Sequence, residues 1–132
     1  MIKKMILFCV AILVVIILFD GIRSILNPLT RSEEVIRDKL LQQTPLGSSM
    51  EDILQFVKKE ALEVRYINYE HGFRYQGVGP TKYVGEKSMR VYFGYYRTIN
   101  NVYLVTDVTV FYGFNDKEEL IDIWVWKTVD GL

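Results

Sequence analysis

The chain has one cysteine and one histidine in 132 residues. Because Cys9 is the only cysteine, no internal disulfide can form, and no later thiol can act as a nucleophile or zinc ligand. With His71 as the only histidine, metal sites built from two histidines are excluded. Asn-x-Ser/Thr, the acceptor for N-glycosylation, does not occur either. An exported protein without disulfides or glycosylation sites is typical of bacteria.

A strong charge of either sign is also missing, since 16 basic residues balance 16 acidic ones. Residues 1–31 hold four basic residues and one acidic residue, a net charge of +3. The remaining 101 residues hold 12 basic and 15 acidic residues, a net charge of −3. A mildly acidic region without a basic stripe cannot neutralise a phosphate backbone. We therefore predict no nucleic-acid partner.

What the sequence does have is a long apolar run. Residues 5–19 contain no charge, and Lys3 and Lys4 precede them. A helix of that length spans about 22 Å, short of the roughly 30 Å hydrocarbon core, so we extend the predicted membrane segment to residues 2–26. A buried core helix would show one polar face, and this run has none. The segment is thus predicted to be a transmembrane anchor or a signal peptide, residues 1–26.

Retention and cleavage remain as alternatives for this segment. A signal peptidase needs small residues before the cut, and a cut after Ser24 would leave Ile22 at the −3 position. A lipidation site would put a small residue before a cysteine that follows the apolar run, but Phe8 precedes Cys9 and most of the run comes after it. The basic N-terminus predicts a cytoplasmic Met1 and an exported C-terminal domain. We expect a single-pass protein of the plasma (inner) membrane, or a secreted or periplasmic one if the segment is removed.

Residues 27–31 are interpreted as a short linker, because Pro28 interrupts the helix. The exported domain is then residues 32–132, and it begins with two predicted helices. Ser32 is a candidate N-cap for a helix that runs through Gln43. In Ser48-Ser49-Met50-Glu51-Asp52, either Ser48 with Glu51 or Ser49 with Asp52 makes a capping-box pattern. This pattern opens a predicted helix over about 49–61 with one apolar face.

After residue 61 the apolar period changes to two, which predicts strands. The predicted strands are 62–69, 88–97, 102–112 and 120–128. We predict an α+β fold in which two helices cover one face of an antiparallel sheet of about four strands. In the first strand, simple alternation puts Leu62, Val64 and Tyr66 on one face. In the last strand, it puts Leu120, Trp124 and Trp126 opposite Ile121, Ile123 and Val125.

Both faces of the late strands carry bulky side chains, so one face would leave aromatic rings in water unless something covers it. Two interpretations remain open: the 70–86 loop folds over this face, or the face binds a protein. The loop is long and rich in glycine, as loops with a function often are. The candidate partner-binding residues are Phe73, Tyr75, Tyr83, Tyr103, Trp124 and Trp126.

Few residues suggest catalysis. Ser88, His71 and Asp107 could form a triad, but no Gly-x-Ser-x-Gly accompanies them. His71 precedes a glycine and is interpreted as an exposed turn residue. The acidic residues Glu118, Glu119 and Asp122 are interpreted as solvated charge. We predict no enzyme activity, no cofactor, no metal site and no evident small-molecule substrate.

The motifs together resemble a known group. An export segment and a short helix precede Pro45-x-Gly47-Ser48-Ser49, and the last strand contains Leu120-x-Asp122-Ile123-x-Val125. This order resembles small bacterial envelope domains of the SmpA/OmlA type, which are similar in fold to the β-lactamase inhibitor protein. The resemblance covers about residues 33–127 and implies a domain that binds other proteins without catalysis. Members commonly carry a lipidation site, and this chain does not.

The sequence therefore predicts a membrane-anchored, non-catalytic envelope domain that binds a protein partner through the aromatic sheet face and the 70–86 loop. One alternative is an immunity or inhibitor protein that neutralises a toxin or an enzyme in the envelope. Another is a small hydrolase that uses carboxylates. A sheet domain that only associates with itself is a further alternative.

Overall fold

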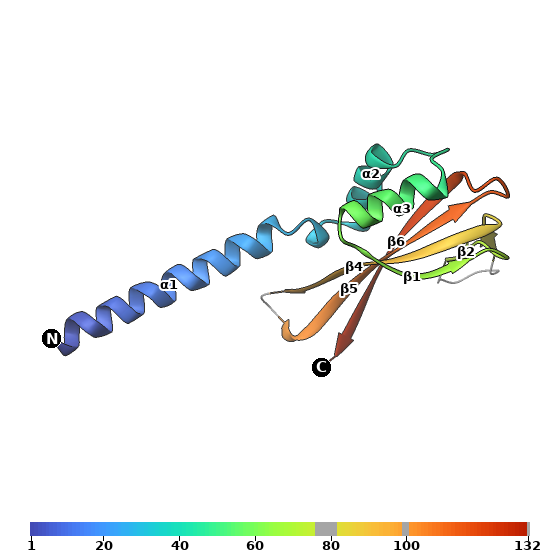
Figure 1. Cartoon of the computed structure of the whole chain (residues 1–132). Coiled ribbons are helices and arrows are strands. Elements are labelled where there is room, and N and C mark those ends of the chain that lie inside the picture. The colour runs from blue at the N-terminus through green and yellow to red at the C-terminus, as the bar shows by residue number, and fades with distance from the viewer. Residues whose placement is uncertain (76–81, 99–100, 132) are drawn as a thin grey trace.

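The computed structural model describes residues 1–75, 82–98 and 101–131, and for residues 20, 21, 23–25, 101, 102 and 131 it describes the backbone alone. The helices of this α+β chain are α1 (Ile2–Leu26), the 3₁₀ turn η1 (Pro28–Thr30), α2 (Glu33–Gln43) and α3 (Met50–Lys59) (Figure 1). The strands are β1 (Glu63–Asn68), β2 (Phe73–Arg74), β3 (Tyr83–Val84), β4 (Lys87–Thr98), β5 (Asn101–Phe114) and β6 (Leu120–Gly131).

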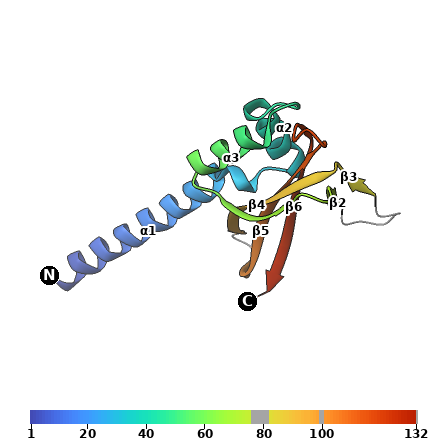
Figure 2. The ribbon, with the colours of Figure 1, turned by 45° about the vertical axis from the view of Figure 1, so that its right-hand side comes forward.

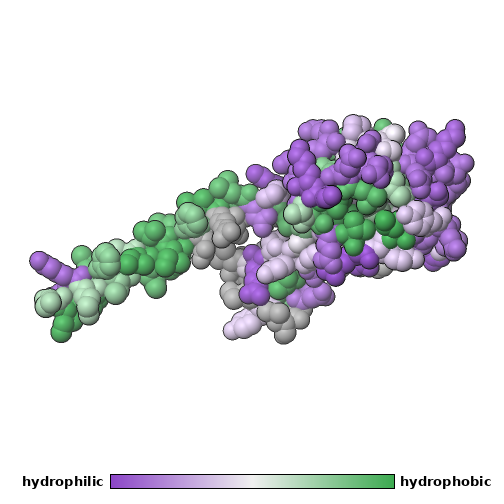
Figure 3. Space-filling model, viewed as in Figure 1, coloured by the Kyte–Doolittle hydropathy of each residue, from purple (hydrophilic) through white to green (hydrophobic). Residues whose placement is uncertain are grey.

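The helix α1 stands away from the rest of the molecule (Figures 1 and 2). Its residues Ile2–Phe19 form the one helical stretch, within the described part of the chain, that is long and apolar enough to cross a membrane. None of this stretch is buried against the protein, and after Lys3 and Lys4 its surface is apolar (Figure 3). The helix is consistent with a membrane anchor, and a signal sequence would look the same.

The predicted linker is held against the domain. The Asn27 side chain accepts a hydrogen bond from the Leu29 amide at 3.0 Å and so caps η1. From β6, Lys127 Nζ donates to the carbonyl oxygens of Leu29 at 2.8 Å and Arg31 at 2.5 Å. It also contacts the Tyr96 hydroxyl at 3.1 Å. One lysine therefore fastens the linker to the sheet.

Both predicted helices of the domain form, with the predicted caps. Ser32 Oγ accepts from the Val35 amide at 3.3 Å at the start of α2. Ser49 Oγ accepts from the Asp52 amide at 3.1 Å at the start of α3. These bonds satisfy amides that a helix leaves without a partner in its first turn.

The main sheet has four antiparallel strands in the order β1-β4-β5-β6, as the sequence predicts. β2 and β3 form a separate short hairpin within residues 70–86. In both ribbon views α2 and α3 lie on the same side of the four-stranded sheet (Figures 1 and 2). The buried core joins side chains of α2 and α3 to side chains of β4, β5 and β6: Ile36, Leu40, Met50, Ile53, Val57, Met89, Val91, Val108, Val110, Tyr112, Phe114, Leu120, Ile123 and Val125.

Two of the predicted strand faces are wrong, because β-bulges interrupt the alternation. The register of β5 with β6 shifts after Gly113, so Leu120 is buried in the core and Ile121 is exposed. The register of β1 with β4 shifts between Val64 and Tyr66. There Val64 packs against the core, whereas Tyr66 is exposed.

Candidate binding surface

Five aromatic side chains gather on the face of the sheet opposite the core, and we call them the aromatic cluster. β5 supplies Phe111, and β6 supplies Trp124 and Trp126. Phe73 belongs to β2, and Tyr75 follows directly after this strand. Phe111 and Trp124 are direct cross-strand partners. Strand alternation places Trp124 and Trp126 on the side opposite Ile123 and Val125, which are core residues.

The rings of the cluster lie close together, with their centroids 5.0–6.2 Å apart. Phe111 and Trp124 stack at 5.0 Å, and Trp124 and Trp126 stack at 5.7 Å. Tyr75 lies 5.1 Å from Trp124 in a tilted arrangement. Aromatic pairs at such distances contribute about 0.5–1.5 kcal/mol beyond the burial of their area. The rings of the cluster therefore stabilise one another in this arrangement.

Phe73 is the buried member of the cluster, with 3% of its surface exposed. Its ring contacts Phe111 and Trp124 and so covers one end of the outer face. Gly113 leaves the space for this ring, because a Cβ atom at Gly113 would lie 2.9 Å from Phe73 Cε1. The start of the predicted 70–86 loop thus folds over part of the aromatic face. Tyr75 stays 45% exposed, and both tryptophans are partly exposed.

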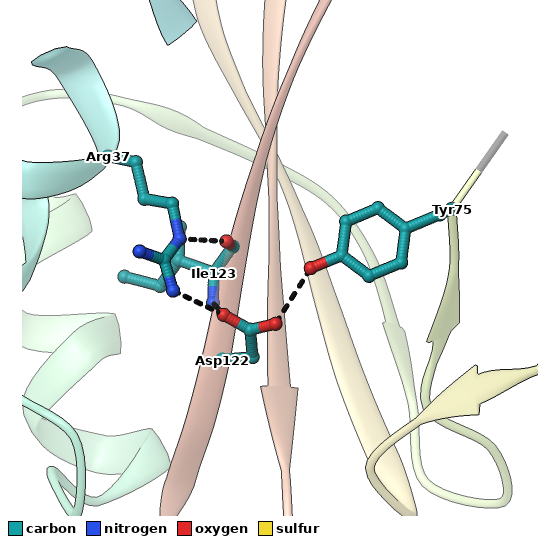
Figure 4. A network of polar contacts seen from close by, with 4 residues as sticks. All are labelled: Arg37, Tyr75, Asp122 and Ile123. Carbon is teal, nitrogen blue, oxygen red and sulfur yellow. Dashed lines mark hydrogen bonds and ion pairs between the residues drawn. The ribbon is translucent and has the colours of Figure 1, made fainter. Parts of the chain in front are cut away.

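A polar network holds Tyr75 in place (Figure 4). The Tyr75 hydroxyl donates to Asp122 Oδ2 at 2.7 Å, and Arg37 of α2 donates to Asp122 Oδ1 at 2.7 Å. Arg37 Nε also donates to the backbone oxygen of Ile123 at 2.9 Å. Asp122 therefore joins the segment after β2 to a helix on the other side of the sheet.

The network changes the pKa values of its three side chains. Burial opposes the ionised form of Asp122, but the hydrogen bonds from Arg37 and Tyr75 outweigh it and lower the pKa of this carboxyl. Burial and the bond to Asp122 raise the pKa of Tyr75 to about 12. The hydrogen bond to Asp122 also raises the pKa of Arg37. All three groups keep their ordinary charge at neutral pH.

Two arginines extend the outer face beyond the cluster. The Arg90 guanidinium lies 5.5 Å from the centre of the Phe111 ring, and that of Arg65 lies 4.7 Å from the Tyr92 ring. The Tyr92 hydroxyl donates to Asp107 at 2.7 Å. Burial and this bond raise the pKa of Tyr92 to about 12. The outer face thus offers aromatic rings, cations and a carboxylate side by side.

Four of the six predicted binding residues come together in the cluster, and two lie elsewhere. Tyr83 belongs to β3, where it stacks on His71 at 5.0 Å and lies under the guanidinium of Arg74 at 4.1 Å. Tyr103 lies in β5 close to its start and is 80% exposed. Of the predicted contact loop, residues 76–81 lie outside the described residues.

Three residues of the aromatic cluster and the Asp122 network were not among the predicted binding residues. Phe111 contacts three other rings of the cluster, and Arg37 and Asp122 fix its edge. The interpretation of Asp122 as solvated charge is wrong, because its carboxylate is paired and hydrogen-bonded. Glu118 is also paired, 3.3 Å from Lys87 Nζ. Alternation along β5 points to Phe111, whereas the contact between Arg37 and Asp122 joins residues 85 positions apart.

The residues of the hypothetical catalytic triad are engaged separately. Ser88 is buried, and its hydroxyl donates to the backbone oxygen of His71 at 3.1 Å. Asp107 accepts from Tyr92. Ser88 pairs with Gly113 of β5, six residues and so about 20 Å along the strand from Asp107. Within the described residues, no group of three or more His, Cys, Asp or Glu side chains could hold a metal ion.

An apolar groove lies on the other side, between the linker and the two helices of the domain. Its volume is about 730 Å³, within the range of roughly 300–1,000 Å³ that is common for small-molecule sites. Leu29, Ile36 and Phe56 are among the apolar residues that line it, and Arg31 and Lys39 are its cations. A second hollow beside Tyr69, His71 and Tyr83 is smaller, about 410 Å³.

Comparisons with family models, with curated proteins and with solved structures gave no match to this chain. The resemblance to envelope domains of the SmpA/OmlA type therefore stays a prediction.

Proposed function

We propose that this protein is a membrane-anchored, non-catalytic domain of the bacterial cell envelope, and that it binds a protein partner through the aromatic cluster. The observation that carries the proposal is the cluster itself. Trp124, Trp126 and Tyr75 are stacked together but only partly covered. Trp and Tyr are favoured at the energetic centres of protein interfaces.

The contacts that hold the rings in place support a binding role. Phe73 and the Asp122 network fix the rings before any partner arrives, so fewer rotamers are lost when a complex forms. A purely structural role would be met by the core, which lies on the opposite face. Arg90 and Asp107 add charged groups that could set the orientation of a partner.

The state of Asp122 argues against one catalytic role, that of a general acid. A carboxylic acid that donates a proton at neutral pH needs a raised pKa, and that of Asp122 is lowered. Its oxygens already accept bonds from Arg37 and Tyr75. Asp122 is the carboxylate closest to the cluster, and it serves to hold Tyr75.

The test is site-specific photo-crosslinking of the full-length chain in membranes of the cell that encodes it. A photoreactive phenylalanine replaces Trp126 in one variant and Tyr75 in a second. The matched control carries it at Leu46, which is 57% exposed in the turn between α2 and α3. We expect one protein to crosslink from positions 126 and 75 and not from position 46, and Trp124→Ala to reduce its yield at least threefold.

Equal crosslinking from all three positions would contradict a specific surface. Absence of any protein adduct at positions 126 and 75, in a chain that is folded and inserted, would contradict the proposal itself.

A further inference from the structure

The sheet extends well past the point where the linker is fastened. Lys127 holds the carbonyl oxygens of the linker, and β6 continues for four more residues to Gly131. At about 3.4 Å per residue, these residues reach about 14 Å beyond the attachment. β5 and β4 run beside β6 there, since Thr106 pairs with both Val129 and Tyr96.

These strand ends lie on the side from which α1 joins the domain. Both ribbon views show the ends of β4, β5 and β6 running away from α2 and α3 and back towards that side (Figures 1 and 2). α1 itself contacts β4. A membrane that holds α1 is therefore also the surface nearest to the strand ends.

The length of α1 sets where the membrane surface falls. Its apolar part, Ile2–Phe19, has 18 residues and spans about 27 Å, close to the roughly 30 Å hydrocarbon core. The last seven residues, through Leu26, add about 10 Å, slightly more than the headgroup layer, which is about 5–7 Å thick on each side. The domain therefore begins at the lipid headgroups. The strand ends, which extend from the domain back towards α1, reach the same headgroup layer.

The side chains at the strand ends suit that position. Tyr103 of β5 and Val129 of β6, which we call the strand-end surface, are 80% and 61% exposed. Tyrosine is enriched where proteins meet the membrane–water interface, because its ring is apolar and its hydroxyl is polar. Arg97 and Asp130 both face Val105 across the ladder and carry opposite charges.

We propose that the strand-end surface rests in the headgroup layer of the bilayer that holds α1, so that the domain stands on the membrane with the aromatic cluster turned sideways. The occupant of this surface is phospholipid. The inference rests on the retained anchor of the proposed function. Because the charges of Arg97 and Asp130 cancel, the contact does not require anionic lipid.

The test uses the full chain with Cys9→Ser, reconstituted in phosphatidylcholine vesicles with and without one quarter phosphatidylglycerol. Single cysteines replace Tyr103, Leu46 or Leu13, and each carries an environment-sensitive fluorophore. Nitroxide lipids then quench the label from the headgroup or from the acyl chain. Position 46 is the exposed control away from the strand ends, and position 13 reports whether α1 is inserted.

We expect headgroup nitroxides to quench position 103 at least threefold more than position 46 in both lipid mixtures, while acyl-chain nitroxides quench position 13. If position 13 is quenched but position 103 matches position 46, the bilayer contact is wrong and the anchor stands. If position 13 is not quenched, both the membrane anchor and the bilayer contact are wrong. A label at 103 that is shielded from water but not quenched by lipid would indicate a protein neighbour and overturn the inference.

Discussion

Single polar groups in the core and at the edge of the cluster change the free energy of unfolding. The Tyr112 hydroxyl is fully buried and has no hydrogen-bond partner among the described residues. A buried hydroxyl without a partner costs about 1–3 kcal/mol relative to water. Burial accordingly raises the pKa of Tyr112 above its usual value near 10.

We predict that Tyr112→Phe raises the free energy of unfolding by about 1 kcal/mol at neutral pH, because it removes the unpaired hydroxyl. Burial favours the neutral form of Tyr112 in the folded state. The free energy of unfolding of the wild type therefore does not vary with pH through this group below about pH 10, and it falls as the pH rises further. The advantage of the variant should therefore widen in alkali. Urea denaturation of the full chain in detergent measures both effects, and Tyr66→Phe, at an exposed position, should change nothing. A destabilised Tyr112→Phe would contradict this account of the core.

At the edge of the cluster, Asp122→Asn should lower the free energy of unfolding by about 1 kcal/mol at neutral pH. The value is modest because the partner Arg37 is partly exposed to solvent. The pKa of Asp122 is lowered by folding, so its stabilisation is complete above about pH 3.9 and is lost as the pH falls through the folded value.

Denaturation curves of the two proteins should therefore converge in acid. Asp116→Asn, at an exposed turn position, is the control and should leave the free energy of unfolding at neutral pH unchanged. A gap between wild type and Asp122→Asn that stays constant down to the lowest pH would show that the charge of Asp122 is not what stabilises the network.

Among the helices and strands, most could be predicted from the sequence. Ser32 and Ser49 cap the helices as their sequence context indicated, since capping depends on residues only three positions apart. The four long strands follow from alternation, which is also local. The bulges at Arg65 and Ile121 were missed because alternation alone does not show where a ladder inserts a residue.

The candidate surface was only partly predictable for the same reason. Trp124 and Trp126 follow from strand alternation, but Phe73 joins them only because Gly113 leaves room across the sheet. The ion pair of Arg37 with Asp122 depends on how α2 lies at the edge of β6, which no local pattern encodes.

The cap of α3 gives a test at this scale. Ser49→Ala leaves the Asp52 amide without its side-chain acceptor and should cost about 1 kcal/mol of unfolding free energy. Ser49→Asn is the matched control, because asparagine caps about as well as serine, and it should retain most of the stability. Equal losses in the two variants would mean that the cap is not the source of the effect.

For the whole molecule, the proposed function requires a domain held firmly to its anchor. Lys127 is the residue that joins the linker to the sheet, through the carbonyl oxygens of Leu29 and Arg31. We predict that Lys127→Met raises the rate of tryptic cleavage after Arg31 severalfold, because the linker is freed. Lys39→Met, at an exposed position of α2, should leave the rate unchanged. An unchanged rate in Lys127→Met would show that other contacts hold the linker.

The central claim is that α1 stays attached, so that the binding surface acts at a membrane. The most direct measurement is the intact mass of the mature protein, together with its N-terminal sequence, from membranes of the cell that encodes it. The account predicts a membrane-bound chain that keeps residues 2–26 and a mass near 15.5 kDa. A soluble product that begins near Ile25 would contradict it.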